Sequence, residues 1–317
     1  MKRFPRWLAL GVARLDYGLA LPLLASLPRW LARPLWILRG CVNYAMDWDW
    51  RTLSLGHGYV REATQYAMAQ LRAQAGTRTL PRRLTLRRFV CMSREEVEAA
   101  RLPHLDRTTI QARISGLEHL LRARDHQQGV VLLTAHFDSL YVGLAALAQT
   151  GLRVNLMSTR LTNDAMVPPA ISRHFATKIA ALNRLLAPGQ VIHVEDNMRF
   201  FVSALRRGEI VVIACDGPST SQDRSQPVDF LGARRLMASG PQFLARAGNA
   251  PLALYTCQEG PGGQFAVEIT EPASLEEGGL QRAYTALEGH LLAHPWQWWA
   301  ADLYRTYVGA DAPTRAS

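Results

Sequence analysis

Residues 129–143 read GVVLLTAHFDSLYVG, and this stretch decides the fold class. The run Gly129–Ala135 is short, apolar and rich in β-branched residues, which is typical of a strand buried on both faces. The residues from Asp138 to Gln149 have the composition of a helix that ends at Gly151. A buried strand followed directly by a helix is the repeating unit of an α/β sheet.

The same alternation continues along the chain. Strands are expected at 152–157, 191–194, 210–215, 251–257 and 265–269, and helices at 109–125, 169–186, 196–207, 239–248 and 280–293. We predict an α/β protein with a central mixed sheet flanked by helices and an apolar, basic N-terminal helical segment. The expected parts are a membrane-associating segment (1–42), an α/β domain (43–308) and a frayed tail (309–317).

Within the second part, residues 76–88 are interpreted as a basic connector that contains a proline. A helix is expected to begin at Ser93, because Glu96 follows it at the spacing of a capping box.

The positive charge is concentrated at the N-terminus. The net charge is +10, and residues 1–40 hold seven basic residues against Asp16 alone. No stretch reaches the ~20 uncharged apolar residues of a membrane span, which excludes a multi-span protein. Arginines beside Trp7, Trp30 and Trp36 favour a helix at a membrane surface. A buried helix with a basic face, or a short or tilted span, remains the alternative. Nucleic-acid binding is not expected, because no recognised module accompanies the charge.

Motifs for metals and nucleotides are missing from the sequence. The four cysteines include no pair with metal-ligand spacing, and neither a phosphate-binding loop nor a G-x-S-x-G motif occurs. We therefore expect no metal and no cofactor. Unpaired cysteines in apolar runs fit a reducing compartment.

The junction after the first strand carries the candidate chemistry. His136 lies between a buried strand and a helix, where α/β proteins place their sites. A neutral imidazole there can take a proton from a hydroxyl group, and the free N–H groups at the start of a helix suit an oxyanion. A histidine that caps the helix or is hydrogen-bonded in the core is the alternative.

Several segments, in order, resemble the bacterial lipid A lauroyl/myristoyl acyltransferases of the lysophospholipid acyltransferase superfamily. The resemblance covers about residues 15–300 and rests on Ile114–Leu120 (ISGLEHL), Gly129–Phe137 (GVVLLTAHF), Gly208–Asp216 (GEIVVIACD), Val228–Gly232 (VDFLG), Ser239-Gly240 followed by Leu244-Ala245-Arg246 and Gly248, and Pro295–Trp299 (PWQWW).

The resemblance implies membrane-associated acyl transfer. An acyl thioester, on acyl carrier protein or coenzyme A, would be attacked by a hydroxyl or amine of a lipid or lipid-like acceptor. The implied location is the cytoplasmic face of a bacterial inner membrane, with the protein peripheral or anchored by its N-terminus. His136 would be the general base, and a carboxylate would orient it.

The chain departs from the family where that carboxylate is expected. Five residues after His136 stands Tyr141, whereas the family has Asp or Glu. The carboxylate could come from Asp138 in the first helical turn or from Asp216 after another strand. An acceptor that needs less base assistance is a third account, and a catalytically silent homologue that binds acyl chains, lipid or acyl carrier protein is a fourth.

Further residues are expected to contact substrate. Phe137 and Ser139 flank the turn, and Arg234, Arg235 and Arg246 are candidates for the phosphates of the acyl donor. Backbone N–H groups at 137–139 or at Ser239-Gly240 are the candidate donors to the oxyanion. After Trp299 the family continues with a basic His-Arg-Arg stretch, where this chain has AADLYR (300–305), which argues against lipid A itself as the acceptor.

Overall fold

A seven-stranded mixed sheet forms the centre of the computed structural model, which describes residues 3–106, 110–160, 166–219 and 224–309. The strand order is β1-β9-β8-β2-β5-β3-β4, and all neighbours are parallel except β8 and β9. The strands are β1 (Ala112–Ser115), β2 (Val130–Thr134), β3 (Val154–Ser158), β4 (Val191–His193), β5 (Ile210–Ala214), β8 (Leu252–Glu259) and β9 (Phe265–Ile269). A separate hairpin pairs β6 (Ser225–Phe230) with β7 (Ala233–Ala238). The predicted α/β class is therefore confirmed.

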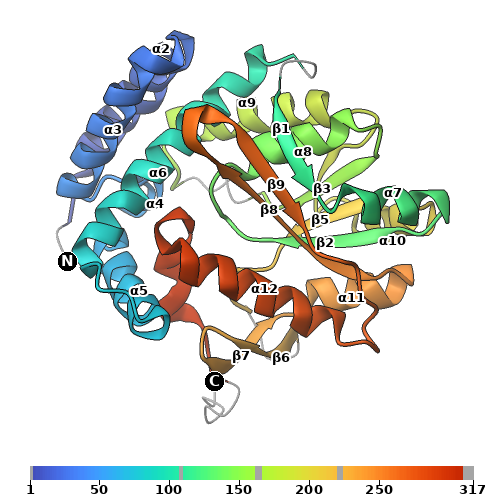
Figure 1. The fold of residues 1–317 in the computed structure, drawn as a ribbon. Helices are drawn as coiled ribbons and strands as arrows, with labels where there is room; N and C mark the ends of the chain where they lie inside the picture. The colour runs from blue at the N-terminus through green and yellow to red at the C-terminus, as the bar shows by residue number, and fades with distance from the viewer. Residues whose placement is uncertain (1–2, 107–109, 161–165, 220–223, 310–317) are drawn as a thin grey trace.

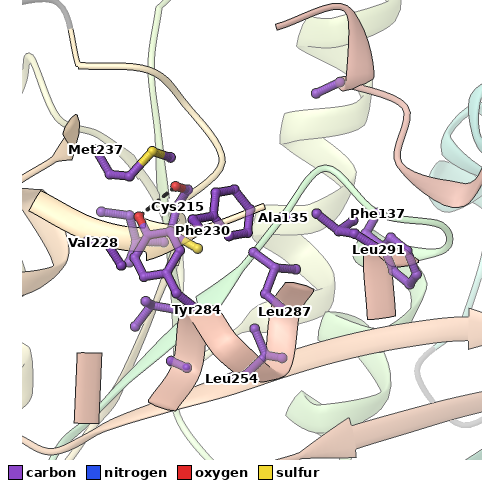
Figure 2. Close-up of a cluster of buried hydrophobic side chains, with 14 of the residues drawn as sticks. Ala135, Phe137, Cys215, Val228, Phe230, Met237, Leu254, Tyr284, Leu287 and Leu291 are labelled. Carbon is purple, nitrogen blue, oxygen red and sulfur yellow. Dashed lines mark hydrogen bonds between the residues drawn. The ribbon is translucent and has the colours of Figure 1, made fainter. Parts of the chain in front are cut away.

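Helices cover both faces of this sheet (Figure 1). The α-helices are α1 (Arg6–Leu15), α2 (Leu21–Ser26), α3 (Arg29–Met46), α4 (Trp50–Leu55), α5 (Val60–Ala75), α6 (Pro81–Arg101), α7 (Leu117–Asp125), α8 (Leu140–Gln149), α9 (Pro169–Leu186), α10 (Met198–Arg206), α11 (Gly240–Gly248) and α12 (Gly279–Ala293). Because side chains alternate along a strand, Val131 and Leu133 of β2 pack with α10, α11 and α12, while Val130 and Leu132 pack with α8 and α9. Figure 2 shows part of the first cluster, where Leu287 and Leu291 of α12 lie close to Ala135 and Phe137.

Two local predictions are wrong. In the expected helix 109–125, residues Ala112–Ser115 form strand β1, and Gly116 at φ +79° separates it from α7. A local helix pattern cannot reveal that β1 pairs with β9, which is more than 150 residues away in the sequence. The helix expected at Ser93 begins at Pro81, because proline suits the first turn, and so the expected connector 76–88 is partly helical. Of the expected tail, residues 310–317 lie outside the described part of the chain.

The N-terminal helices pack against α6 and α9 and expose their other side. Ala13, Tyr17 and Leu21 are buried in a cluster with Ile171 of α9. Figure 1 shows α2 and α3 along the outer side of α6. The segment Arg6–Ser26, which includes a short π-helix, is long and apolar enough to cross a membrane by length and composition.

A buried ion-pair network ties this segment to the rest of the protein. The guanidinium of Arg39 in α3 lies 2.6 Å from Asp16 and 2.6 Å from Glu96 of α6. Tyr17 also donates a hydrogen bond to Glu96. Asp16 and Tyr17 are at the middle of Arg6–Ser26, so the centre of this apolar segment is bound to charged groups of the folded domain.

Candidate active site

His136 and Asp216 follow two neighbouring parallel strands. Thr134 of β2 is in register with Ala214 of β5, so the residues two positions beyond each strand meet at the same edge of the sheet. Nδ1 of His136 is 2.9 Å from Oδ1 of Asp216, and the backbone N–H of His136 donates to Oδ2 at 2.9 Å. Of the two carboxylates that the sequence left open, Asp216 is the one that hydrogen-bonds the imidazole.

The Asp216 carboxylate is fully buried and is bound by several donors. Nε1 of Trp298 donates to Oδ2 at 2.9 Å. The hydroxyl of Tyr307 donates to the backbone carbonyl of Asp216 at 2.8 Å. Burial by itself raises the pKa of the Asp216 carboxyl. The charge of His136 and the hydrogen bonds from His136 and Trp298 outweigh it, so the pKa lies below its usual value. Asp216 is therefore ionised at neutral pH and can stabilise an imidazolium.

Hydrogen bonds from α12 and between β2 and β5 also fix the backbone around Asp216. Tyr284 of α12 donates to the carbonyl of Cys215 at 2.9 Å, and both residues belong to the apolar cluster in Figure 2. The N–H of Cys215 donates to the carbonyl of Thr134 at 2.7 Å, which extends the pairing of β2 and β5 up to the site. The position of Asp216 thus follows from the packing of the sheet against α12.

The His136 imidazole is held on one side and open on another. The Trp299 ring packs edge-on against it, with ring centroids 5.1 Å apart. The backbone N–H of Trp299 donates to the backbone carbonyl of His136 at 2.9 Å. The His136 side chain is 36% exposed. No residue of the described chain hydrogen-bonds its Nε2, so this nitrogen is available to a substrate hydroxyl or amine.

Asp138 is placed differently from Asp216. It is fully buried at φ +42°, and its carboxylate forms an ion pair with Arg94 of α6. It accepts hydrogen bonds from the N–H of Glu259 at 3.0 Å and from Nε2 of Gln297 at 2.7 Å. Within the described residues no hydrogen bond joins it to the His136 imidazole. Asp138 holds the turn that follows His136.

Tyr141, the residue at the family's carboxylate position, lies beside the site on α8. Its ring is 6.1 Å from that of Trp299, and the ammonium of Lys178 is 4.3 Å from its centroid. Burial raises the pKa of the Tyr141 phenol, an effect that the charge of Lys178 only partly offsets. The phenol is therefore neutral at pH 7 and supplies no negative charge.

The turn that follows His136 has no N–H group left for a substrate. Those of Phe137, Asp138 and Ser139 donate to the carbonyls of Ala135, Gln297 and Cys257 respectively. The side chains of Phe137 and Ser139 are buried, that of Phe137 in the cluster of Figure 2. The expectation of an oxyanion site at 137–139 is therefore wrong, because the turn uses these groups for its own stability.

The other expected oxyanion site begins α11. The N–H of Ser239 donates to the carbonyl of Arg224 at 2.9 Å. Gly240 lies against β5, since a Cβ at this position would come within 3.2 Å of Ile213 Cδ1. The start of α11 is thus next to the strand that leads to Asp216.

The three arginines expected to bind donor phosphate are not equivalent. Arg235 is buried and donates to the carbonyls of Phe230 and Leu231 and to the hydroxyl of Tyr304. It therefore stabilises the β6–β7 hairpin, and the expectation for this residue is wrong. Arg234 and Arg246 are exposed.

Several residues of the site were not predicted as such from the sequence. Trp298 lies inside the family motif Pro295–Trp299, which is the sequence signal that points to it. Arg94 lies in a helix whose sequence has the pattern of an ordinary charged segment. Nothing in the sequence around Lys178 indicates a buried cation. Among the described residues, no group of three or more His, Cys, Asp or Glu side chains is arranged to hold a metal ion.

The model of the bacterial lipid A biosynthesis acyltransferase family matches residues 80–299. The match covers more than half of the chain and includes His136, Asp216 and Trp298. Comparison with curated proteins gives no match. The family predicted from the ordered motifs is therefore confirmed, and the chain belongs to the bacterial lipid A biosynthesis acyltransferases.

Proposed function

We propose that this protein transfers a fatty acyl group from an acyl thioester, carried by acyl carrier protein or coenzyme A, to a hydroxyl or amine of a lipid or lipid-like acceptor. The reaction takes place at the cytoplasmic face of a bacterial inner membrane. The observation that carries the proposal is the 2.9 Å contact between Nδ1 of a half-exposed His136 and the ionised, buried Asp216. A base oriented by a carboxylate is the arrangement that acyl transfer to a hydroxyl requires.

The proton follows a closed path in this mechanism. Nε2 of His136 takes the proton of the acceptor hydroxyl or amine as its oxygen or nitrogen attacks the thioester carbonyl. Asp216 stabilises the imidazolium that results. When the tetrahedral intermediate collapses, the carbon–sulfur bond breaks and the leaving thiolate takes the proton from the imidazolium. The products are the acylated acceptor and a free thiol, and His136 is neutral again.

The start of α11 is the proposed site for the oxyanion. The N-terminus of a helix carries free N–H groups and the positive end of the helix dipole. Gly240 lies close to β5, and its N–H is the proposed donor, because the N–H of Ser239 donates to Arg224 and residue 241 is a proline. The exposed Arg234 and Arg246 are the proposed contacts for the phosphates of the donor, because either guanidinium can bind phosphate in a bidentate manner.

Membrane association rests on the exposed side of the N-terminal helices. Large apolar side chains there include Trp7, Leu15, Leu19, Leu23, Trp30 and Leu38. Arg6, Arg14 and Arg33 are interspersed with them in the sequence and can reach lipid phosphates. Because Asp16 in the middle of Arg6–Ser26 is ion-paired with Arg39, we favour a segment that lies in the membrane surface over one that crosses it.

The acyl transfer is tested by comparing lipids from bacteria that express the wild type or His136→Ala. We expect a species heavier by one acyl chain only with the wild type, because the alanine variant lacks the base. Mass spectrometry of total lipid and small-molecule extracts identifies both the chain and the acceptor. If the same species is formed by a folded His136→Ala protein, the proposal is wrong. If neither protein forms a product in the native organism, the proposal of acyl transfer is replaced by the alternative, a catalytically silent homologue that binds lipid.

The membrane contact is tested with Leu19→Glu. Leu19 is 64% exposed on the N-terminal segment, and Leu80, at the N-cap of α6, is 62% exposed and serves as the matched control. Placing a carboxylate on an apolar face that binds anionic lipid is expected to weaken binding about tenfold or more. Co-sedimentation with phosphatidylglycerol-containing vesicles measures the effect. Equal binding by Leu19→Glu and Leu80→Glu would contradict membrane contact through this face.

A further inference from the structure

A buried cation lies behind Tyr141. Lys178 of α9 is only 3% exposed, and its ammonium lies 4.3 Å from the ring centroid of Tyr141 and 4.6 Å from that of Phe175. Burial by itself lowers the pKa of Lys178, but the neutral Tyr141 hydroxyl, as a hydrogen-bond acceptor, and the Glu95 carboxylate outweigh this effect and raise the pKa above its usual value. Lys178 therefore keeps its positive charge at neutral pH.

Two aromatic side chains link this charge to the general base. Tyr141 contacts both Lys178 and Trp299, and Trp299 packs directly against the His136 imidazole. Aromatic rings and buried side chains screen charges much less than water does. An unbalanced positive charge at Lys178 would therefore oppose the second positive charge that forms when His136 takes up a proton.

Glu95 of α6 is the group that faces this cation. It is 2% exposed, and Oε1 lies 3.7 Å from Nζ of Lys178. Neither carboxylate oxygen accepts a hydrogen bond from a described residue. The charged groups that act on it are Lys178 of α9, Glu96 and Glu98 of its own helix, and His136 after β2.

We infer that Glu95 is a positioning residue of this site, which acts through Lys178: its carboxylate balances the buried ammonium and so supports proton uptake by His136. The inference rests on the proposed role of His136 as the base. Asp216 acts directly on the imidazole through a hydrogen bond, whereas Glu95 acts over a longer distance through charge.

The ionisation of Glu95 makes this support dependent on pH. Burial raises the pKa of Glu95 to about 7, although Lys178 lowers it. Below that pH the carboxyl becomes neutral, and the charge of Lys178 is left unbalanced. The charged His136 imidazolium favours the ionised form of Glu95. Because coupling between two sites is reciprocal, ionised Glu95 also favours the imidazolium. The support is therefore present above pH 7 and is lost as the pH falls through 7.

Chemical labelling of His136 tests the inference without an activity assay. Diethylpyrocarbonate reacts with neutral imidazole, so the pH midpoint of His136 labelling in the full chain, followed by peptide mass spectrometry, reports its protonation. In Glu95→Gln we expect the midpoint to fall by about 0.5 pH unit, since the uncompensated ammonium disfavours the imidazolium. In the double variant Glu95→Gln/Lys178→Met, which removes both charges, we expect it to return toward the wild-type value.

Glu98→Gln is the matched control. Glu98 is also a buried glutamate of α6, but it faces Arg94. Its charge raises the pKa of Glu95, so its removal favours ionised Glu95. The His136 midpoint in Glu98→Gln is therefore expected to stay at the wild-type value or to rise, opposite to the fall in Glu95→Gln. An unshifted midpoint in Glu95→Gln, or a shift that persists in the double variant, overturns the inference. If this occurs while His136→Ala still abolishes the acylated product, the proposed function stands and only the role of Glu95 is rejected.

Discussion

Asp216→Asn is expected to lower kcat by about 10⁴-fold, the size of the effect when the acid of a Ser-His-Asp triad loses its charge. The hydrogen bonds explain why the substitution is severe. Oδ2 of Asp216 accepts from the His136 backbone N–H and from Trp298 Nε1, while Oδ1 contacts Nδ1 of His136. An asparagine that still accepts the first two bonds must point its NH₂ group at Nδ1. The ring proton then moves to Nε2, where the base needs its lone pair.

The measurement is steady-state acyl transfer with a purified acyl thioester donor and the acceptor identified from the lipid comparison. Asp229→Asn is the control, because Asp229 is an exposed carboxylate on β6 and, within the described residues, no hydrogen bond joins its side chain to His136 or Asp216. The control is expected to retain wild-type kcat. A loss of less than tenfold in a folded Asp216→Asn protein would contradict the assignment of Asp216 as the carboxylate that orients His136.

Asp138→Asn is expected to act on stability instead and to lower the free energy of unfolding by about 3 kcal/mol, the lower part of the range for breaking a buried ion pair. Asparagine tolerates the positive φ of this position, so the substitution removes the charge with little backbone strain. Arg94, whose side chain is 15% exposed, would keep Glu259 at 2.7 Å and Glu98 at 3.4 Å as its remaining partners. These partners place the expected loss toward the lower end of the range.

Urea unfolding, followed by tryptophan fluorescence, measures this loss. Asp229→Asn again serves as the control and is expected to change the free energy of unfolding by less than about 0.5 kcal/mol. The two variants are thus expected to differ: Asp216→Asn lowers kcat, whereas Asp138→Asn lowers the free energy of unfolding. A 10⁴-fold loss of kcat in Asp138→Asn with unchanged stability would reverse their roles.

The accuracy of the sequence-based predictions varied with the range of the interactions involved. Strands β2 and β5 were expected at 129–135 and 210–215 and occur at Val130–Thr134 and Ile210–Ala214, because a strand buried on both faces must be continuously apolar. The edge strand β1 carries no such signal, since its residues alternate between half-buried and exposed positions, and the local pattern there predicts a helix. The β6–β7 hairpin contains the family motif Val228–Gly232, but the sequence pattern predicts no strands there.

By itself the sequence determined the α/β class, the family and the position of His136 at a strand-to-helix junction, because buried strands and short ordered motifs are local patterns. Only the tertiary structure decided between Asp138 and Asp216. Asp138 is two residues from His136, but its backbone turns its carboxylate toward Arg94. Asp216 is 80 residues away and meets the imidazole because β2 and β5 are paired in parallel register. Glu95 and Lys178 come from two further helices, and only packing brings their charges together next to the base.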